Sequence, residues 1–167
     1  MNRITALILS ACFLLAPVTT WADPAITGPV SAKVIKVYDG DTFTVEAYPW
    51  PGLQAKAEVQ VNGVDTPEIR GECDTEKEKA IEARHYVKGL ILNQTVSLEN
   101  VKHRKYAGRV VADVKLNNGD SLAEKIIQQE LGREYHGGAR ESWCLDEQEN
   151  QAPLIPDLLP FVPFDIK

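Results

Sequence analysis

The stretch Lys36–Val45, KVYDGDTFTV, places two aspartates on either side of a glycine, between two segments with the composition of β-strands. Asp-Gly pairs between alternating apolar residues are typical of β-hairpin turns. Either Asp39 or Asp41 alone would be enough to form such a turn. The second aspartate therefore needs another explanation, and the hairpin becomes the first candidate for a functional site.

Short segments rich in Val and Thr, many with alternating apolar residues, recur along the chain and predict β-strands. They cover residues 31–38, 42–48, 56–64, 95–101 and 109–116. A chain of 167 residues with 44% hydrophobic residues fits one globular domain. Five short strands in one domain indicate a small barrel or sandwich.

Two segments with helical periodicity interrupt these strands, at residues 75–92 and 121–132. Each opens with residues at capping-box spacing, namely Thr75 with Glu78 and Ser121 with Glu124. Gly132 is expected to end the second helix. The expected apolar face of the first helix comprises Ile81, Ala83, Tyr86, Val87 and Leu90.

The first 22 residues have the pattern of a cleaved signal peptide, with Arg3 ahead of an apolar run and small residues near Ala22. A membrane anchor fits less well because about 20 apolar residues are needed to cross a bilayer and this run is shorter. A lipoprotein signal at Cys12 also fits less well, since the apolar run continues past the cysteine. We expect a secreted or periplasmic protein without stable membrane association.

The expected mature chain has its domain at residues 23–146 and a proline-rich tail at 147–167. Four prolines exclude a helix in the tail, which leaves an extended segment lying on the domain or a mobile end. The mature chain retains two cysteines, Cys73 and Cys144. In an oxidising compartment these favour a disulfide, which would stabilise the domain by about 4 kcal/mol. Two buried free thiols are the alternative, and a zinc site is disfavoured without a Cys-x-x-Cys pair.

The charge balance argues against nonspecific binding of nucleic acids. The whole chain has a formal net charge of −6. Without Arg3 the mature chain has 17 basic against 24 acidic residues, or −7. Residues 102–109, KHRKYAGR, are locally basic around Tyr106. This run is either a nucleic-acid contact or a solvated face.

A second acidic motif lies at residues 62–71, NGVDTPEIRG, where Asp65 and Glu68 flank Thr66 and a proline. The proline keeps Thr66 out of the helical region, so the strand ends in a rigid turn. If the aspartates of both motifs converged they would repel one another, and Ca²⁺ or Mg²⁺ would compensate. Alternatively, these aspartates only form turns or face solvent.

Three motifs together, VYDGDTFTV, NGVDTPE and KYAGRVVADV, resemble the staphylococcal nuclease (thermonuclease) family. The resemblance runs from Ala32 to Trp143. It implies an α+β, mostly β fold: a five-stranded OB-type barrel with two or three packed helices. It also implies an endonuclease that hydrolyses phosphodiesters of DNA or RNA and depends on one Ca²⁺ ion.

The resemblance also implies roles for individual residues. Asp41 and Asp65 would bind calcium through their carboxylates and Thr66 through its backbone carbonyl, which leaves Asp39 to shape the hairpin. Glu68 would activate the attacking water. Arg109 would bind the scissile phosphate and neutralise charge in the transition state. Arg109 follows Tyr106 by one residue more than is usual in the family, so Arg104 is the substitute candidate.

Gln60 departs from the family pattern, which has a second phosphate-binding arginine five residues before the second calcium aspartate. Loss of one such donor typically costs about 2.7–4 kcal/mol. Lys56 starts about 13 Å away along the strand, too far to replace it, whereas Arg70 could reach the site from its loop.

Two functions follow from these observations. The first is an exported, monomeric, calcium-dependent nuclease that Gln60 makes slow. The second is a nuclease-fold module that binds nucleic acid with weak or no catalysis.

Overall fold

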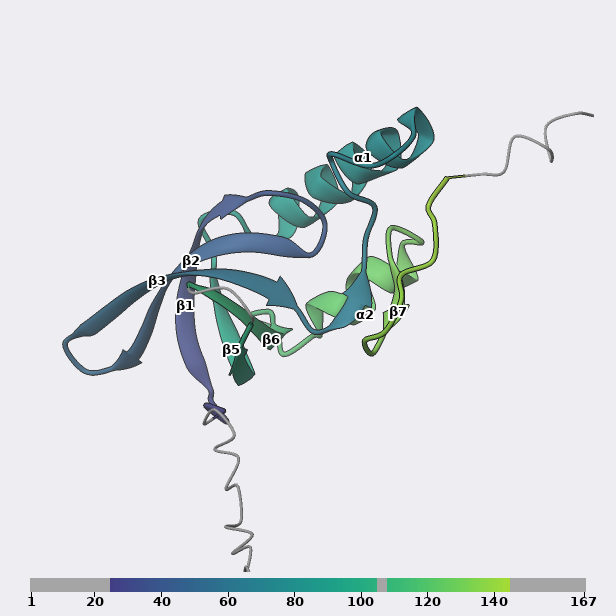
Figure 1. Ribbon diagram of the computed structural model, residues 1–167. Coiled ribbons are helices and arrows are strands. Elements are labelled where there is room, and N and C mark those ends of the chain that lie inside the picture. The colour runs from purple at the N-terminus through teal and green to yellow at the C-terminus, as the bar shows by residue number, and fades with distance from the viewer. Residues whose placement is uncertain (1–24, 105–107, 145–167) are drawn as a thin grey trace, which may run out of the picture.

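The computed structural model describes residues 25–104 and 108–144 (Figure 1). The expected signal peptide, the proline-rich tail and Tyr106 lie outside these residues. Within them the elements are β1 Val30–Val37, β2 Thr42–Trp50, β3 Leu53–Val61, β4 Gly63–Asp65, α1 Asp74–Ile91, β5 Thr95–His103, β6 Arg109–Lys115, α2 Leu122–Gln128 and β7 Arg133–Tyr135. Neither of these two helices is long and apolar enough to cross a membrane.

Five strands close into a barrel in the order β1-β2-β3-β6-β5, and β1 pairs with β5 to complete it. All neighbours are antiparallel except β3 and β6, which run parallel. Figure 1 shows α1 on one side of the barrel and α2 near the short β4–β7 pair. The expectation of a mostly β fold with a five-stranded barrel and packed helices is confirmed, with two helices in the described residues.

The barrel interior is filled by the inward-facing residues of the strands, as their alternation predicts. Phe43, Val34 and Val59 are fully buried. Burial of each such side chain contributes about 1.5–3 kcal/mol relative to exposure. The helix α1 covers this core through its buried apolar residues Ala80, Ala83, Val87 and Ile91.

Two expectations for α1 are wrong. The helix begins at Asp74 with Cys73 as its N-cap, and no side chain caps it, so Thr75 lies inside the first turn. Ile81 is 43% exposed instead of facing the core. With Cys73 as N-cap, the helix starts two residues earlier than the capping box would start it. Ala83 and Val87 of the expected face are buried, but the buried stripe also includes Glu76 and Ala80 in place of Ile81.

The cap of α2 is as expected, because Ser121 accepts a hydrogen bond from the backbone N–H of Glu124. The helix ends at Gln128, however, four residues before Gly132. Glu130 has a φ of 59°, which turns the chain before the glycine is reached. A Cβ on Gly132 would lie 2.8 Å from side-chain atoms of Ile126 and Val64, so this glycine permits close packing instead of ending the helix.

The third predicted strand, residues 56–64, is divided in the structure. Gly63 has a φ of 83° and separates β3 from β4. The short β4 leaves the barrel and pairs antiparallel with β7, with Asp65 opposite Arg133. This turn carries the second acidic motif away from the barrel and towards the C-terminal part of the domain.

Candidate active site

The two acidic motifs meet because the Asp39–Asp41 turn packs against the turn after β4. The backbone N–H groups of Tyr38 and Asp39 close the hairpin by donating to the carbonyl of Thr42, at 2.9 and 3.3 Å. A Cβ on Gly40 would lie 2.8 Å from Cγ2 of Thr66 and 2.9 Å from Cβ of Ala83 on α1. The glycine therefore lets the hairpin approach both the Thr66 turn and the helix.

Asp41 is buried and held from two sides. The residue is only 2% exposed. Oδ1 accepts a hydrogen bond from the hydroxyl of Thr42 at 2.8 Å, and Oδ2 accepts one from the amide of Gln60 at 3.2 Å. Gln60 comes from β3, where it pairs with Thr42 in the barrel register. The barrel thus fixes the orientation of this carboxylate.

Asp65 is 1% exposed and is surrounded by cations and an indole. Oδ2 accepts hydrogen bonds from Nε of Arg133 at 3.2 Å and from Nε1 of Trp143 at 3.0 Å. The Arg133 guanidinium also stacks on the Trp143 ring, 4.2 Å from its centroid. Oδ1 lies 2.9 Å from Nε of Arg140, an ion pair without hydrogen-bond alignment.

Asp39, the residue expected to shape the hairpin, is buried, with the residue at 3% exposure. Burial, followed by the charges of Asp41 and Glu68, raises the pKa of Asp39 to about 8. Burial also raises the pKa of Asp41. At neutral pH without a bound cation, Asp39 thus holds a proton beside its neighbour.

Several oxygen atoms of the site could take a hard cation. Oδ1 of Asp39, Oδ1 of Asp65 and Oγ1 of Thr66 are buried and receive no hydrogen bond from the described residues. Carboxylate and carbonyl oxygens are the ligands that Ca²⁺ prefers. Asp41, Asp65 and Thr66 therefore fit a calcium ion by their chemistry.

The carboxylate oxygens of this site lie farther apart from one another than the oxygens that bind one metal ion. In the described part of the chain, the one set of three Cys or acidic side chains with ligand atoms within 4.8 Å is Cys73, Glu76 and Cys144. That set is a disulfide with a neighbouring carboxylate and not a thiolate metal site. The acids of the site are spread around a guanidinium, that of Arg140.

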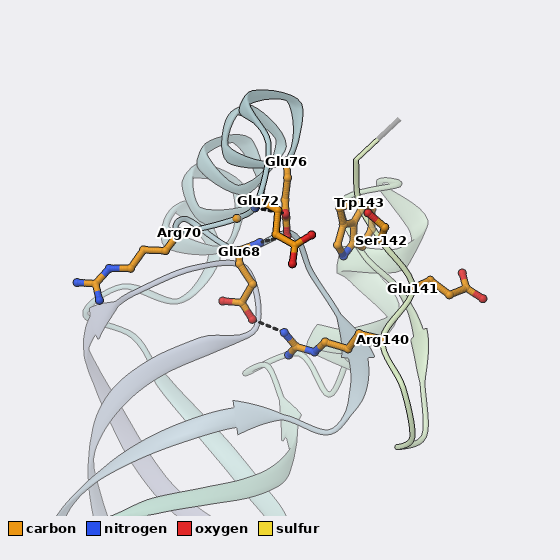
Figure 2. Close-up of a pocket in the computed structure, with 9 residues that line it drawn as sticks. Glu68, Arg70, Glu72, Glu76, Arg140, Glu141, Ser142 and Trp143 are labelled. Carbon is orange, nitrogen blue, oxygen red and sulfur yellow. Dashed lines mark hydrogen bonds and ion pairs between the residues drawn. The ribbon is translucent and has the colours of Figure 1, made fainter. Parts of the chain in front are cut away.

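Glu68 lies in a loop that Glu76 organises. The buried carboxylate of Glu76 accepts hydrogen bonds from the backbone N–H groups of Glu68 and Glu72, at 3.2 and 2.9 Å. Figure 2 shows these contacts above the Glu68 side chain, which points down towards Arg140. The backbone at Glu68 is therefore held in place by a side chain of the neighbouring helix α1.

The side chain of Glu68 borders a groove of about 280 Å³. The residues around this groove include three of the predicted site residues, Gln60, Glu68 and Arg109, together with Asp39, Arg104 and Arg140. Nε of Arg109 lies 2.6 Å from Oε1 of Glu58, its neighbour across the β3–β6 pair. The groove therefore presents both a carboxylate and several guanidinium groups.

Arg70 does not join this groove. It borders a neighbouring cavity of about 390 Å³, which shares Glu68 and Arg140 with the groove but lacks Gln60 and Arg109. In Figure 2 its side chain extends away from the pair formed by Glu68 and Arg140. The position of Arg70 therefore does not support the prediction that it replaces the missing arginine.

Arg140 was not singled out in the sequence, yet it contacts three acids. Nη1 pairs with Oε1 of Glu68, Nε lies 2.9 Å from Oδ1 of Asp65, and Nη2 lies 4.0 Å from Oδ2 of Asp41. Burial opposes the charge, but the hydrogen bond to Glu68 and the charges of the aspartates outweigh it and raise the pKa of Arg140. Arg133, Trp143 and Glu76 were also missed.

Cys73 and Cys144 form a disulfide, as expected, with their Cα atoms 5.9 Å apart. Cys73 follows Glu68 by five residues, and Cys144 follows Arg140 by four. The bridge thus ties the loop of Glu68 to the segment of Arg140.

The closed barrel, its two helices and the acidic turn beside them define an OB-like fold of the nuclease type. Residues 58–153, more than half of the chain, match the family described as staphylococcal nuclease homologue. The chain belongs to this family. Asp41 precedes the matched residues, while Gln60, Asp65, Glu68, Arg109 and Arg140 lie within them. A comparison with curated protein sequences gave no match.

Proposed function

We propose that this protein is a calcium-dependent nuclease that hydrolyses phosphodiester bonds of DNA or RNA. The observation that carries the proposal is the convergence, in one groove of a nuclease-family domain, of an acidic cluster and guanidinium groups. Asp39 and Glu68 are acids that line this groove, and Arg104, Arg109 and Arg140 supply its guanidinium groups. Asp41 and Asp65 lie next to it, where Arg140 approaches both carboxylates.

Glu68 is the proposed proton acceptor. The oxygen of a water molecule attacks phosphorus, and this water gives one proton to the Glu68 carboxylate. At the same time the bond between phosphorus and the leaving oxygen breaks. The leaving oxygen takes a proton from solvent, so that one water is consumed and a phosphate monoester and an alcohol are formed. Arg109 neutralises the charge that develops on the phosphoryl oxygens.

The proposed metal ligands are the carboxylates of Asp41 and Asp65 and the backbone carbonyl of Thr66. A bound Ca²⁺ would polarise a phosphoryl oxygen and lower the cost of charge in the transition state. The turn carrying Asp41 is fixed by the close approach of Gly40, and Asp65 by its bonds to Arg133 and Trp143. Both carboxylates are thus positioned before substrate arrives.

We also propose export, with residues 1–22 as a cleaved signal and a secreted or periplasmic monomer as the mature form. The Cys73–Cys144 disulfide supports this proposal, because such bonds persist mainly in oxidising compartments. The predicted domain limits, 23–146, and the tail at 147–167 are part of the same proposal.

The test is a zymogram with single-stranded DNA, double-stranded DNA and RNA, each in calcium and in chelator. The purified chain should degrade at least one substrate in calcium alone, and Glu68→Gln should remove most of this activity. The control is Glu82→Gln, which changes an exposed acid on α1 and should cleave like the unchanged protein. If the protein bound single-stranded DNA but cleaved nothing in calcium, the nucleic-acid-binding module would replace the nuclease.

A further inference from the structure

The groove lacks an arginine at the position of Gln60, and the glutamine is already engaged. Its Nε2 donates to Oδ2 of Asp41 at 3.2 Å. A glutamine in this position orients the carboxylate but brings no charge to a phosphate. The groove therefore needs a second cation from elsewhere in the chain if it is to hold a phosphodiester through two guanidinium groups.

Arg140 brings a guanidinium to this position from the C-terminal part of the domain. Its Nη2 lies 4.0 Å from Oδ2 of Asp41, the same oxygen that Gln60 contacts. Arg140 and Gln60 also border the same groove. Arg140 borders the cavity of Arg70 as well, whereas Gln60 does not. The guanidinium thus stands beside the end of the Gln60 side chain.

The donors of Arg140 are only partly used. Nη1 bonds to Glu68 (Figure 2), and Nε pairs with Asp65. At 4.0 Å from Asp41, Nη2 is too far for a hydrogen bond, and it makes none with the described residues. The side chain is 37% exposed, so it remains accessible to a substrate in the groove.

A rigid C-terminal clamp, defined here as residues 140–144, presents Arg140. Arg133 donates to the backbone carbonyls of Glu141 and Ser142. The indole of Trp143 donates to Asp65, and Cys144 is bonded to Cys73. Positioning by such contacts is needed for a charge to act on a transition state without reorganisation.

We propose that Arg140 is a catalytic residue that binds the scissile phosphate together with Arg109, and that it supplies the charge that Gln60 lacks. This proposal rests on the proposed nuclease function. The planar fork of an arginine suits two oxygens of one phosphoryl group. The pair with Glu68 also holds the proton acceptor beside the phosphate-binding group, so one contact orients both.

The first experiment compares Arg140→Ala, Arg140→Lys and Arg70→Ala in calcium. Arg140→Ala should lower kcat/KM by about 10²–10³, and Arg140→Lys should retain part of the rate. Arg70→Ala removes the same charge from a neighbouring loop and should change kcat/KM by less than about three-fold. Thermal unfolding and calcium titration confirm that each variant is folded and binds the ion. If Arg140→Ala cleaves like the unchanged protein, the proposal is overturned while the nuclease function stands.

The second experiment needs no catalysis. A thymidine dinucleotide and its uncharged methylphosphonate analogue are titrated in chelator and followed by NMR. Arg140→Ala should weaken binding of the charged dinucleotide by about ten-fold and leave the analogue unchanged. Equal effects on both probes would mean that Arg140 only shapes the groove, and would overturn the proposal. This result is independent of whether the chain cleaves nucleic acid.

The third experiment restores the charge at the position of Gln60. In the Arg140→Ala background, Gln60→Arg should recover about ten-fold or more of the lost rate. In the otherwise unchanged protein, Gln60→Arg should give a smaller gain than in the Arg140→Ala background, because Arg140 already supplies the charge and the substitution removes the Gln60 contact to Asp41. Strong acceleration by Gln60→Arg alone, with no loss from Arg140→Ala, would show an unfilled position and overturn the proposal.

Discussion

The buried carboxylate of Glu76 accepts a hydrogen bond from the backbone N–H of Glu68, at 3.2 Å. This contact joins the helix α1 to the proposed proton acceptor without touching its side chain. The same carboxylate accepts a hydrogen bond from the N–H of Glu72 at 2.9 Å, so two backbone donors depend on one acid. Glu76 is therefore a positioning residue.

Glu76→Ala should lower kcat by about ten-fold or more, because it leaves the Glu68 loop without its anchor. It should also cost about 1–3 kcal/mol of stability, since the N–H groups lose their acceptor. The control is Ala80→Gly, which weakens α1 at another buried position by about 1 kcal/mol. The measurement is the kcat of both variants from steady-state kinetics at saturating calcium. If Ala80→Gly lowered kcat by a similar factor, the loss in Glu76→Ala would come from weakening the helix and not from a positioning role of Glu76.

Calcium should raise the melting temperature of the mature protein, because a ligand bound only by the folded state stabilises it. Asp41→Ala should abolish this shift, whereas Asp113→Ala, which changes an acid of β6 that does not line the groove, should retain it. Differential scanning calorimetry across a calcium series gives the measurement. An unchanged melting temperature in the intact protein would contradict the metal assignment.

The metal-free protein should lose stability as pH rises. The pKa of Asp39 is near 3.8 when unfolded and about 8 when folded, so the folded state holds the extra proton between these values. The free energy of unfolding should therefore fall as pH rises towards 8, by up to about 1.4 kcal/mol per pH unit. Arg140 faces the same cluster, and its raised pKa keeps it charged over this range.

Urea unfolding in chelator at several pH values tests this prediction. Asp39→Asn should flatten the slope because the amide does not titrate. Asp74→Asn alters a carboxylate that is 94% exposed and should leave the slope unchanged. The idea fails if Asp39→Asn and the unchanged protein give the same dependence on pH.

Gly40→Ala should impair both folding and calcium binding. The added methyl group would lie within 2.9 Å of Thr66 and Ala83, so the hairpin must move away from the second acidic turn. A cost of about 1–3 kcal/mol is expected for such overpacking. Gly89→Ala is the matched control, since its Cβ meets nothing within 4 Å on α1 and should stabilise the helix. Calorimetry and calcium titration of the two variants provide the comparison.

The Cys73–Cys144 bond should be found as one disulfide in non-reducing peptide mapping of exported protein. Its reduction should lower stability by about 4 kcal/mol, because the bridge closes a loop across 71 positions. Reduction should also loosen the C-terminal clamp, so the rate should fall towards that of Arg140→Ala. Two thiols that alkylate readily in freshly purified protein would refute the pairing.

The barrel could be predicted from the sequence because its signals are local. The alternation around Val59 and Val61 places these residues in the core and Gln60 in the groove. The boundaries of α1 were less predictable. Thr75 and Glu78 have capping-box spacing, but a disulfide at Cys73 and a buried Glu76 decide where this helix begins.

The acidic half of the site was predictable, since a family resemblance identified Asp41, Asp65 and Glu68 before their positions were known. Arg140 was not, because its nearest acid in the site is 72 positions away in the chain. One signal was available. A bridge between Cys73 and Cys144 brings the residues just before each cysteine together, and these include Glu68 and Arg140.

This distance along the chain has a consequence for biosynthesis. The acids of the site leave the ribosome first, and Arg140 follows Glu68 by 72 positions, which takes about 4–14 s at common rates of translation. During that interval the carboxylates repel one another without their counter-charge. A chain that stops before Arg140 would lack both the guanidinium and the cysteine that secures it. If Arg140 acts as proposed, a chain that ends before residue 140 should lack the nuclease activity, which should appear only once residues 140–144 are present.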